Sequence, residues 1–234
     1  MERRQTQLAT FARTGAARSG PSARFARGFV RAVFALLFRS RLEGQLPATG
    51  PYLLVANHQG WADAFLLIAL LPAEPRLYFI GDLKGISQTW WKRLVLRWLG
   101  GVVAVQRDGS SERGAIDIVL DLLAQGAVVG IFAEGRVSHA EAQLATFQRG
   151  AGYLAMKANV PVVPVWLRGT AELYLRRELV ACVGAACTAP CVTPTKAATV
   201  AFAAELQDRL AALATPWVEP EGVRKHCRWL TDIL

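Results

Sequence analysis

The chain has 234 residues, of which 53% are hydrophobic and 19% charged, so it can bury the core of one large domain and is not disordered as a whole. Its formal net charge is +9, and residues 1–41 supply almost all of it, because they hold nine Arg against one Glu and leave +1 for the rest. A nucleic-acid-binding module needs basic residues across its body, so this near-neutral body argues against one. Four cysteines without a C-x-x-C pair predict neither a zinc site nor a disulfide framework.

The first 41 residues form a basic arm. Residues 1–23 combine Arg with Ser, Thr, Gly and Ala, which predicts a mobile tail. From Arg24 to Arg39, aromatic and aliphatic residues alternate with Arg in the pattern of an amphipathic basic helix. Such a helix either lies on an anionic membrane or packs on its own domain, and the sequence leaves both open. A nucleic-acid-binding arm and an organellar transit peptide are the minor alternatives.

The remaining residues, 42–234, predict one domain. Short β-rich runs alternate with helical stretches, which is typical of an α/β fold with a largely parallel or mixed sheet flanked by helices. The expected strands are Tyr52–Ala56, Arg76–Ile80, Val102–Val105, Ala127–Phe132 and Pro161–Leu167. The expected helices are Ala64–Leu71, Ile86–Leu99, Glu112–Gln125, Gly150–Ala158 and Ala197–Ala214. No run is long enough to span a membrane as an uninterrupted apolar helix.

Four places along the expected strands could form a site: polar residues follow three of the strands, at the edge where ligands bind in open α/β sheets, and a proline lies within another. After the first strand come His58 and Asp63, and a carboxylate bonded to one imidazole nitrogen leaves the other free to take a proton from a hydroxyl. By itself this pair is also compatible with a structural helix cap. Arg107 follows the third strand and offers a fork of donors suited to phosphate, although a plain surface charge fits too.

The next two places are less specific. Glu134, Gly135 and Arg136 follow the fourth strand, where glycine permits close backbone approach to a ligand, or simply makes a turn. Pro164 interrupts the fifth strand, and because proline removes a ladder donor, it predicts an edge strand or a wall facing a ligand.

In this order and spacing, the four places resemble the motifs of the lysophospholipid acyltransferase family, glycerolipid acyltransferases that share an H-x-x-x-x-D motif, over about residues 50–170. The matching residues are His58 and Asp63 of the catalytic pair, Arg107 of the second motif, Glu134 and Gly135 of the third, and Pro164 of the fourth. The third motif departs from the usual F-P-E-G-T-R-S, because Ala133 replaces proline and Arg136 comes one place early. In its details the chain looks most like the 2-acylglycerophosphoethanolamine acyltransferase domain.

The resemblance implies transfer of an acyl group from acyl-CoA or acyl carrier protein to the free hydroxyl of a lysophospholipid. It implies His58 as the base, Asp63 as its orienting carboxylate, and substrate contacts from Arg107, Glu134, Gly135, Arg136 and Pro164. It implies that no covalent acyl-enzyme forms, consistent with the lack of a G-x-S-x-G elbow and of a cysteine in these motifs. It also implies no metal and no cofactor beyond the thioester. The expected partner is a membrane lipid surface, not nucleic acid, and the expected place is the cytoplasmic face of a bacterial inner membrane.

Two alternatives remain from the sequence. The same pair would serve another acceptor, such as lysophosphatidic acid, glycerol 3-phosphate or an ornithine-type lipid. A catalytically inactive lipid-binding scaffold is the alternative of another class, although His58 and Asp63 are both present.

Overall fold

The computed structural model describes residues 18–82, 101–105, 110–138, 141, 143–190, 193–215, 222 and 224–233. Three sequence predictions lie outside this part of the chain: the tail up to residue 17, the helix Ile86–Leu99, and the position of Arg107.

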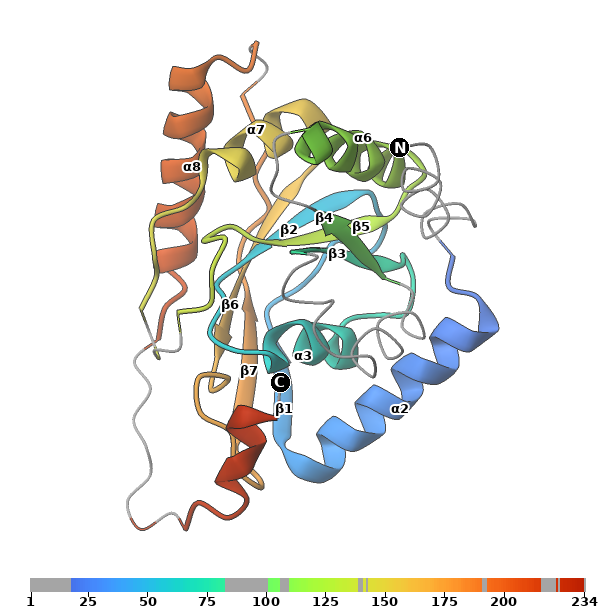
Figure 1. Ribbon diagram of the computed structural model, residues 1–234, viewed down its shortest axis with the longest axis vertical. Coiled ribbons are helices and arrows are strands. Elements are labelled where there is room, and N and C mark those ends of the chain that lie inside the picture. The colour runs from blue at the N-terminus through green and yellow to red at the C-terminus, as the bar shows by residue number, and fades with distance from the viewer. Residues whose placement is uncertain are drawn as a thin grey trace.

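A seven-stranded sheet forms the centre of the molecule, in the order β1-β7-β6-β2-β5-β3-β4 (Figure 1). Its strands are β1 (Arg39–Glu43), β2 (Tyr52–Ala56), β3 (Leu77–Asp82), β4 (Val102–Val105), β5 (Val128–Phe132), β6 (Val162–Arg168) and β7 (Glu178–Val183). Strands β2 to β6 run parallel to one another, whereas β7 is antiparallel to β6 and parallel to β1. The predicted α/β class with a mixed, largely parallel sheet is confirmed.

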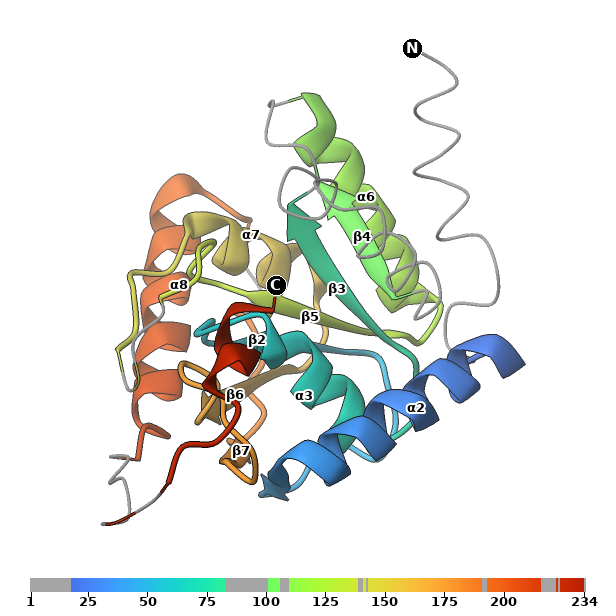
Figure 2. The ribbon, with the colours of Figure 1, turned by 60° about the horizontal axis from the view of Figure 1, so that its bottom comes forward.

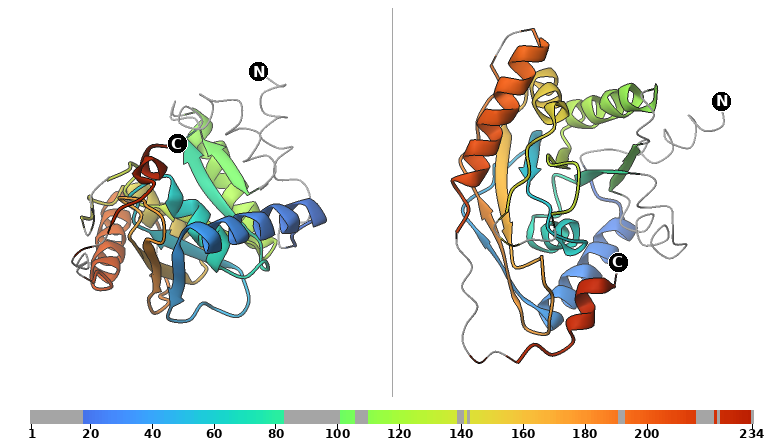
Figure 3. Two further views of the ribbon diagram at one scale, coloured as in Figure 1. Left: turned by 90° about the horizontal axis from the view of Figure 1, so that it is seen from below. Right: turned by 60° about the vertical axis from the view of Figure 1, so that its left-hand side comes forward.

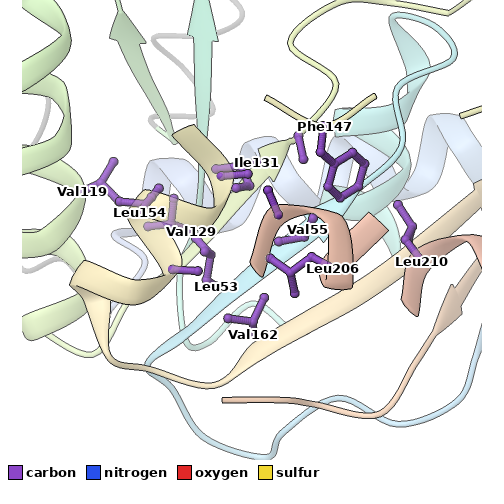
Figure 4. Close-up of a cluster of buried hydrophobic side chains, with 14 of the residues drawn as sticks. Leu53, Val55, Val119, Val129, Ile131, Phe147, Leu154, Val162, Leu206 and Leu210 are labelled. Atoms are coloured by element: carbon purple, nitrogen blue, oxygen red, sulfur yellow. The ribbon is translucent and has the colours of Figure 1, made fainter. Parts of the chain in front are cut away.

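Helices cover both faces of the sheet. On one face lie α2 (Pro21–Leu37) and α3 (Ala62–Leu70), and on the other lie α6 (Ser110–Ala124), α7 (Arg149–Ala158) and α8 (Lys196–Ala211) (Figure 1). Every residue of β2 is buried, as expected of a parallel strand covered on both faces. Its side chains alternate, so Leu53 and Val55 join the core under α6 to α8 (Figure 4), while Leu54 joins the core under α2 and α3.

Strand β6 lies inside the sheet, between β2 and β7, so the sequence-based expectation of an edge strand is wrong. Its proline is tolerated because the pairing with β7 begins only at Val165, one residue after Pro164. The sequence analysis also missed β1 and β7, the two strands that continue the sheet beyond β6.

The amphipathic helix α2 begins with Pro21 and packs on α3 through Ala26, Val30 and Phe34. Its opposite side exposes Phe25, Phe29 and Leu36, which are 65%, 57% and 73% exposed. The boundary expected after Arg41 falls within β1, because that strand runs to Glu43 and pairs with β7. Among the described helices, none is long and apolar enough to cross a bilayer.

Candidate active site

The two loops that follow β2 and β5 meet at one edge of the sheet. These strands are parallel neighbours, and their last residues, Ala56 and Phe132, lie opposite each other. His58 and Glu134 each stand two residues further along, so the register places them together. We call residues 57–61, which connect β2 to α3, the His58 loop.

His58 and Asp63 form a hydrogen-bonded pair, with 2.7 Å between His58 Nδ1 and Asp63 Oδ2. Asp63 lies in the first turn of α3 and is fully buried, and its Oδ2 also accepts the backbone N–H groups of Gln59 at 2.6 Å and Gly60 at 2.9 Å. With His58 Nδ1, three donors therefore converge on one carboxylate oxygen at the amino end of α3. Because a carboxylate only accepts, Nδ1 donates the proton and Nε2 is left as the basic nitrogen.

Aromatic stacking fixes the plane of the His58 ring. The ring lies on Phe132, with centroids 4.1 Å apart and planes at 14°, and Phe132 in turn stacks on Phe79 with centroids 5.8 Å apart. The His58 side chain remains 22% exposed, whereas its carboxylate partner is not exposed at all. A substrate can therefore reach the imidazole from solvent while the carboxylate stays dry.

The Glu134 carboxylate accepts hydrogen bonds from two backbone N–H groups at this edge of the sheet. Its Oε1 accepts the His58 backbone N–H at 2.9 Å, its Oε2 accepts the Ala145 N–H at 2.8 Å, and the residue is 1% exposed. The family resemblance implied that Glu134 contacts substrate. The structure instead uses both carboxylate oxygens to tie the His58 loop to the segment before α7.

Glu134→Gln tests this tie. The amide offers one acceptor where the carboxylate offers two, so one buried N–H loses its partner, and we expect a loss of about 1–3 kcal/mol in the free energy of unfolding. The rate constant kcat should fall while KM for the acceptor stays nearly constant, because the change moves His58 and not the substrate contacts. Chemical denaturation and steady-state kinetics measure both. Glu205→Gln, on the exposed side of α8, is the control, and a large rise in KM alone would contradict the interpretation.

Two further polar side chains, which the sequence analysis did not single out, position the His58 loop. The Asn57 amide donates to the Leu167 carbonyl at 2.9 Å and accepts the Leu167 N–H at 2.6 Å, so it extends the pairing of β2 with β6. Gln59 accepts from the Thr170 hydroxyl at 3.0 Å. The sequence offered one signal for Asn57, which is a polar residue directly after an apolar run that was expected to be a buried strand.

Gly60 lies against the loop that follows β6, and a Cβ at this position would stand 2.8 Å from the Thr170 carbonyl oxygen. Because that oxygen belongs to backbone, we expect Gly60→Ala to displace the His58 loop, to cost about 1–3 kcal/mol of stability and to lower kcat. Thermal unfolding and initial rates measure the effect. Gly114→Ala, where a Cβ has open space, is the matched control; similar losses in both variants would contradict the close contact.

The other predicted site residues are Gly135, Arg136, Pro164 and Arg107, of which the first three lie on or after strands that pair with β2. Gly135 has a positive φ of 67° directly after Glu134, and Arg136 is exposed at the same turn. Pro164 is buried within β6, opposite Val55 of β2, and the Gly184 N–H donates to its carbonyl at 2.9 Å. Arg107 follows β4, whose carboxyl end lies at the same edge of the sheet as that of β2, but it is outside the described residues.

Backbone N–H groups at the start of a helix such as α3 can donate to a developing oxyanion. The structure shows three of them already engaged: Gln59 and Gly60 donate to Asp63 Oδ2, and Asp63 donates to the Gly60 carbonyl at 3.3 Å. These three amides orient the carboxylate and are not available for an oxyanion.

Two of the cysteines lie away from the pair. Cys182 lies in β7, where burial, with a contribution from the Glu43 carboxylate, raises the pKa of its thiol to about 11. Burial also raises the pKa of Cys187. Both therefore stay protonated near neutral pH. Within the described ranges, no group of three or more His, Cys, Asp or Glu side chains is placed to hold a metal ion.

Residues 38–168 match the model of the Acyltransferase family. Among curated proteins, the chain is similar to 1-acyl-sn-glycerol-3-phosphate acyltransferase alpha of Mus musculus, with 29% identity over 56% of this chain and 45% of that protein. It is similar to the human beta enzyme of that name, with 30% identity over 64% of this chain and 52% of that protein. The chain thus spans about half the length of the curated relatives it matches.

A solved structure shares the fold. The 1-acyl-sn-glycerophosphate (LPA) acyltransferase PlsC of Thermotoga maritima aligns over 84% of this chain and 81% of its own, with a TM-score of 0.64 and 20% sequence identity. At this identity the likeness concerns the arrangement of helices and strands.

Proposed function

The chain belongs to the Acyltransferase family, and on that premise we propose that it transfers an acyl group from a thioester, acyl-CoA or acyl carrier protein, to the free hydroxyl of a lysophospholipid. The observation that carries the proposal is the His58–Asp63 pair, whose carboxylate is buried and triply hydrogen-bonded while the imidazole stays open to solvent. This is the arrangement of a general base held in one tautomer.

In the proposed step, the acceptor hydroxyl oxygen attacks the thioester carbonyl carbon as His58 Nε2 takes the hydroxyl proton. Asp63 stabilises the imidazolium that forms, through the 2.7 Å hydrogen bond to Nδ1. The tetrahedral intermediate then expels the thiolate, which receives the proton from His58. One C–O bond forms, one C–S bond breaks, and no acyl group is attached to the protein.

For the acceptor we propose 1-acylglycerol 3-phosphate, because the curated relatives carry this acceptor in their names. Arg107, which comes two residues after β4 in the sequence, would pair with the phosphate, and Arg136 is exposed on the turn next to the His58 loop and would do the same. Lysophosphatidylethanolamine, glycerol 3-phosphate and an ornithine-type lipid are the competing acceptors.

For one part of the acyl chain we propose the largely apolar pocket between α2, α3 and β3, which has a volume of about 50 Å³ and also includes Arg27 and Arg76 in its lining. Phe65, Ile68, Leu77 and Phe79 contribute to its lining, and Phe79 is joined to His58 through the stacked Phe132 ring. The stack therefore connects the proposed base to an apolar surface of the kind that an acyl chain occupies.

The test offers purified protein palmitoyl-CoA or palmitoyl carrier protein together with each of the four acceptors, and identifies products by mass spectrometry. We expect a product with 1-acylglycerol 3-phosphate that His58→Ala does not form. A product with lysophosphatidylethanolamine alone would overturn the acceptor. No product with any pair, in a protein that still binds vesicles, would favour the inactive lipid-binding scaffold.

We further propose that the protein works at a membrane surface, on the cytoplasmic face of a bacterial inner membrane. Phe25, Phe29 and Leu36 are exposed on α2, together with the basic side chain of Arg31 and with Arg24, which pairs with Glu74. Exposed apolar residues flanked by Arg suit an anionic leaflet, where each cation contributes about 1 kcal/mol.

A further inference from the structure

Residues 224–233, which include the short helix η1 (Arg228–Asp232), lie beside α3 on the face that also carries α2 (Figure 2). We call them the C-terminal strap. The Trp61 indole N–H, from the His58 loop, donates to the Leu230 carbonyl at 3.0 Å. The Thr231 hydroxyl accepts the Leu173 N–H at 2.9 Å and donates to the Leu173 carbonyl at 3.1 Å. The strap is thereby fixed to the body.

The inner side of the strap is part of the core, and its outer side is not. Leu230 is 3% exposed and belongs to the same buried cluster as Val30 of α2. The next residue back, Trp229, is 64% exposed, and Ile233 is 37% exposed. The strap thus buries one large apolar side chain and exposes two others. This pattern is typical of an element that lies between the protein core and another apolar partner, such as a membrane.

The exposed apolar residues of the described chain gather on three joined segments. Those residues are Phe25, Phe29, Leu36, Leu175, Val200, Trp229 and Ile233. All except Val200, which lies on α8 across the sheet, belong to α2, to the loop after β6, or to the strap. Backbone hydrogen bonds join the three segments, from Arg176 N–H to the Leu37 carbonyl at 2.6 Å and from Leu175 N–H to the His226 carbonyl at 2.9 Å. In the right-hand view of Figure 3, η1 (red) lies near the carboxyl end of α2 (blue).

The charge around this surface is basic. Exposed cations on the loop and the strap are Arg176, Arg224 and Arg228, with Lys225 half-buried between them. Glu172 pairs with Lys225 at 2.6 Å and with Arg228 at 2.7 Å, and Asp232 is the other acid. Two acids against four cations leave a net positive surface, which is the complement of anionic lipid headgroups. An exposed Trp beside Arg is characteristic of the interface between headgroups and acyl chains.

We propose that the C-terminal strap is a second membrane contact, in which Trp229 inserts at the surface of an anionic bilayer beside the face of α2. This inference rests on the proposed work at a membrane and deepens it. A protein held at the bilayer by one amphipathic helix can still tilt about the axis of that helix. Two contacts, one on α2 and one on the strap, restrict this tilt. Because Trp61 connects the strap to the His58 loop, the two contacts also fix how the His58 loop is oriented relative to the bilayer.

The experiment measures binding of the full chain to vesicles of phosphatidylglycerol and phosphatidylethanolamine, without acyl donor or acceptor. We expect Trp229→Ala to weaken binding about tenfold or more, the effect of withdrawing one large aromatic side chain from an apolar phase. Val200→Ala, the exposed apolar residue away from the surface, should bind as the wild type does. Vesicles with brominated acyl chains should quench the fluorescence of the wild type more than that of Trp229→Phe.

Equal vesicle binding by Trp229→Ala and the wild type, or equal quenching of the wild type and Trp229→Phe, would overturn the proposal. A change from dimer to monomer in Trp229→Ala, with vesicle binding unaltered, would overturn it in favour of a second copy of the chain. Since no substrate is present, these results bear on the strap alone. Failure of the wild type to form product in the acceptor test bears on the proposed reaction alone.

Discussion

His58→Ala is expected to lower kcat by roughly 10²- to 10⁴-fold, which corresponds to about 3–5 kcal/mol of lost transition-state stabilisation. The physical reason is that the acceptor hydroxyl is a weak nucleophile until a base takes its proton, and His58 Nε2 is the basic nitrogen that the Asp63 bond leaves open. Binding of the donor and acceptor should change little. Steady-state kinetics with varied acceptor separate kcat from KM.

The matched control is His226→Ala, because His226 lies exposed on the strap and its side chain has no part in the proposed chemistry. His58→Gln is the second variant, since it keeps a polar side chain of similar size on Phe132 while removing the base. If His58→Gln retained wild-type kcat, proton transfer by His58 would not be part of the reaction.

Asp63→Asn is expected to lower kcat by at least about 10²-fold while the fold is kept. An asparagine oxygen placed where Oδ2 stands can still accept from His58 Nδ1, Gln59 N–H and Gly60 N–H, so the geometry survives. The negative charge is lost, and the imidazolium that forms in the transition state loses its counter-ion in a fully buried position. The asparagine NH₂ would also occupy the place of Oδ1, a buried atom without a hydrogen-bond partner.

Asp121→Asn, an exposed change of the same chemistry on α6, is the control for Asp63→Asn. Circular dichroism and thermal unfolding establish that both variants are folded before their rates are compared. A fall in kcat of less than about tenfold, about 1.4 kcal/mol, would mean that the charge of Asp63 is not needed in the transition state.

Much of the fold follows from alternation of short β runs and helical stretches. All five expected strands are present within one or two residues of their predicted ends, and so are the helices α3, α6 and α7. Helix α8 begins one residue before its predicted start and ends at Ala211, three residues before the predicted Ala214. Strand β7 was missed because Glu178–Val183 carries the small residues Ala181 and Cys182, which give a weak strand signal. Strand β7 is the neighbour that places β6 inside the sheet, whereas the expectation of an edge strand came from Pro164.

At the site, the sequence located the pair but not its supports. Spacing in a loop and a helix start was enough to suggest that His58 and Asp63 turn inward together, and they lie in hydrogen-bond contact. The sequence also singled out Glu134 as a site residue. Its hydrogen-bond partners could not be predicted, because they are backbone N–H groups, which every residue except proline has. The same holds for the amides of Gln59 and Gly60, whose orientation toward Asp63 only the folded loop reveals.

The most direct test of the central claim mixes enzyme with excess palmitoyl-CoA and 1-acylglycerol 3-phosphate, quenches with acid during the first turnover, and measures both product and intact protein mass. Direct transfer at the His58–Asp63 pair predicts product in the wild type, protein of unmodified mass at every time point, and no product above background in His58→Ala. Product formed by His58→Ala at the wild-type rate, or a protein mass raised by one palmitoyl group before product appears, would contradict it.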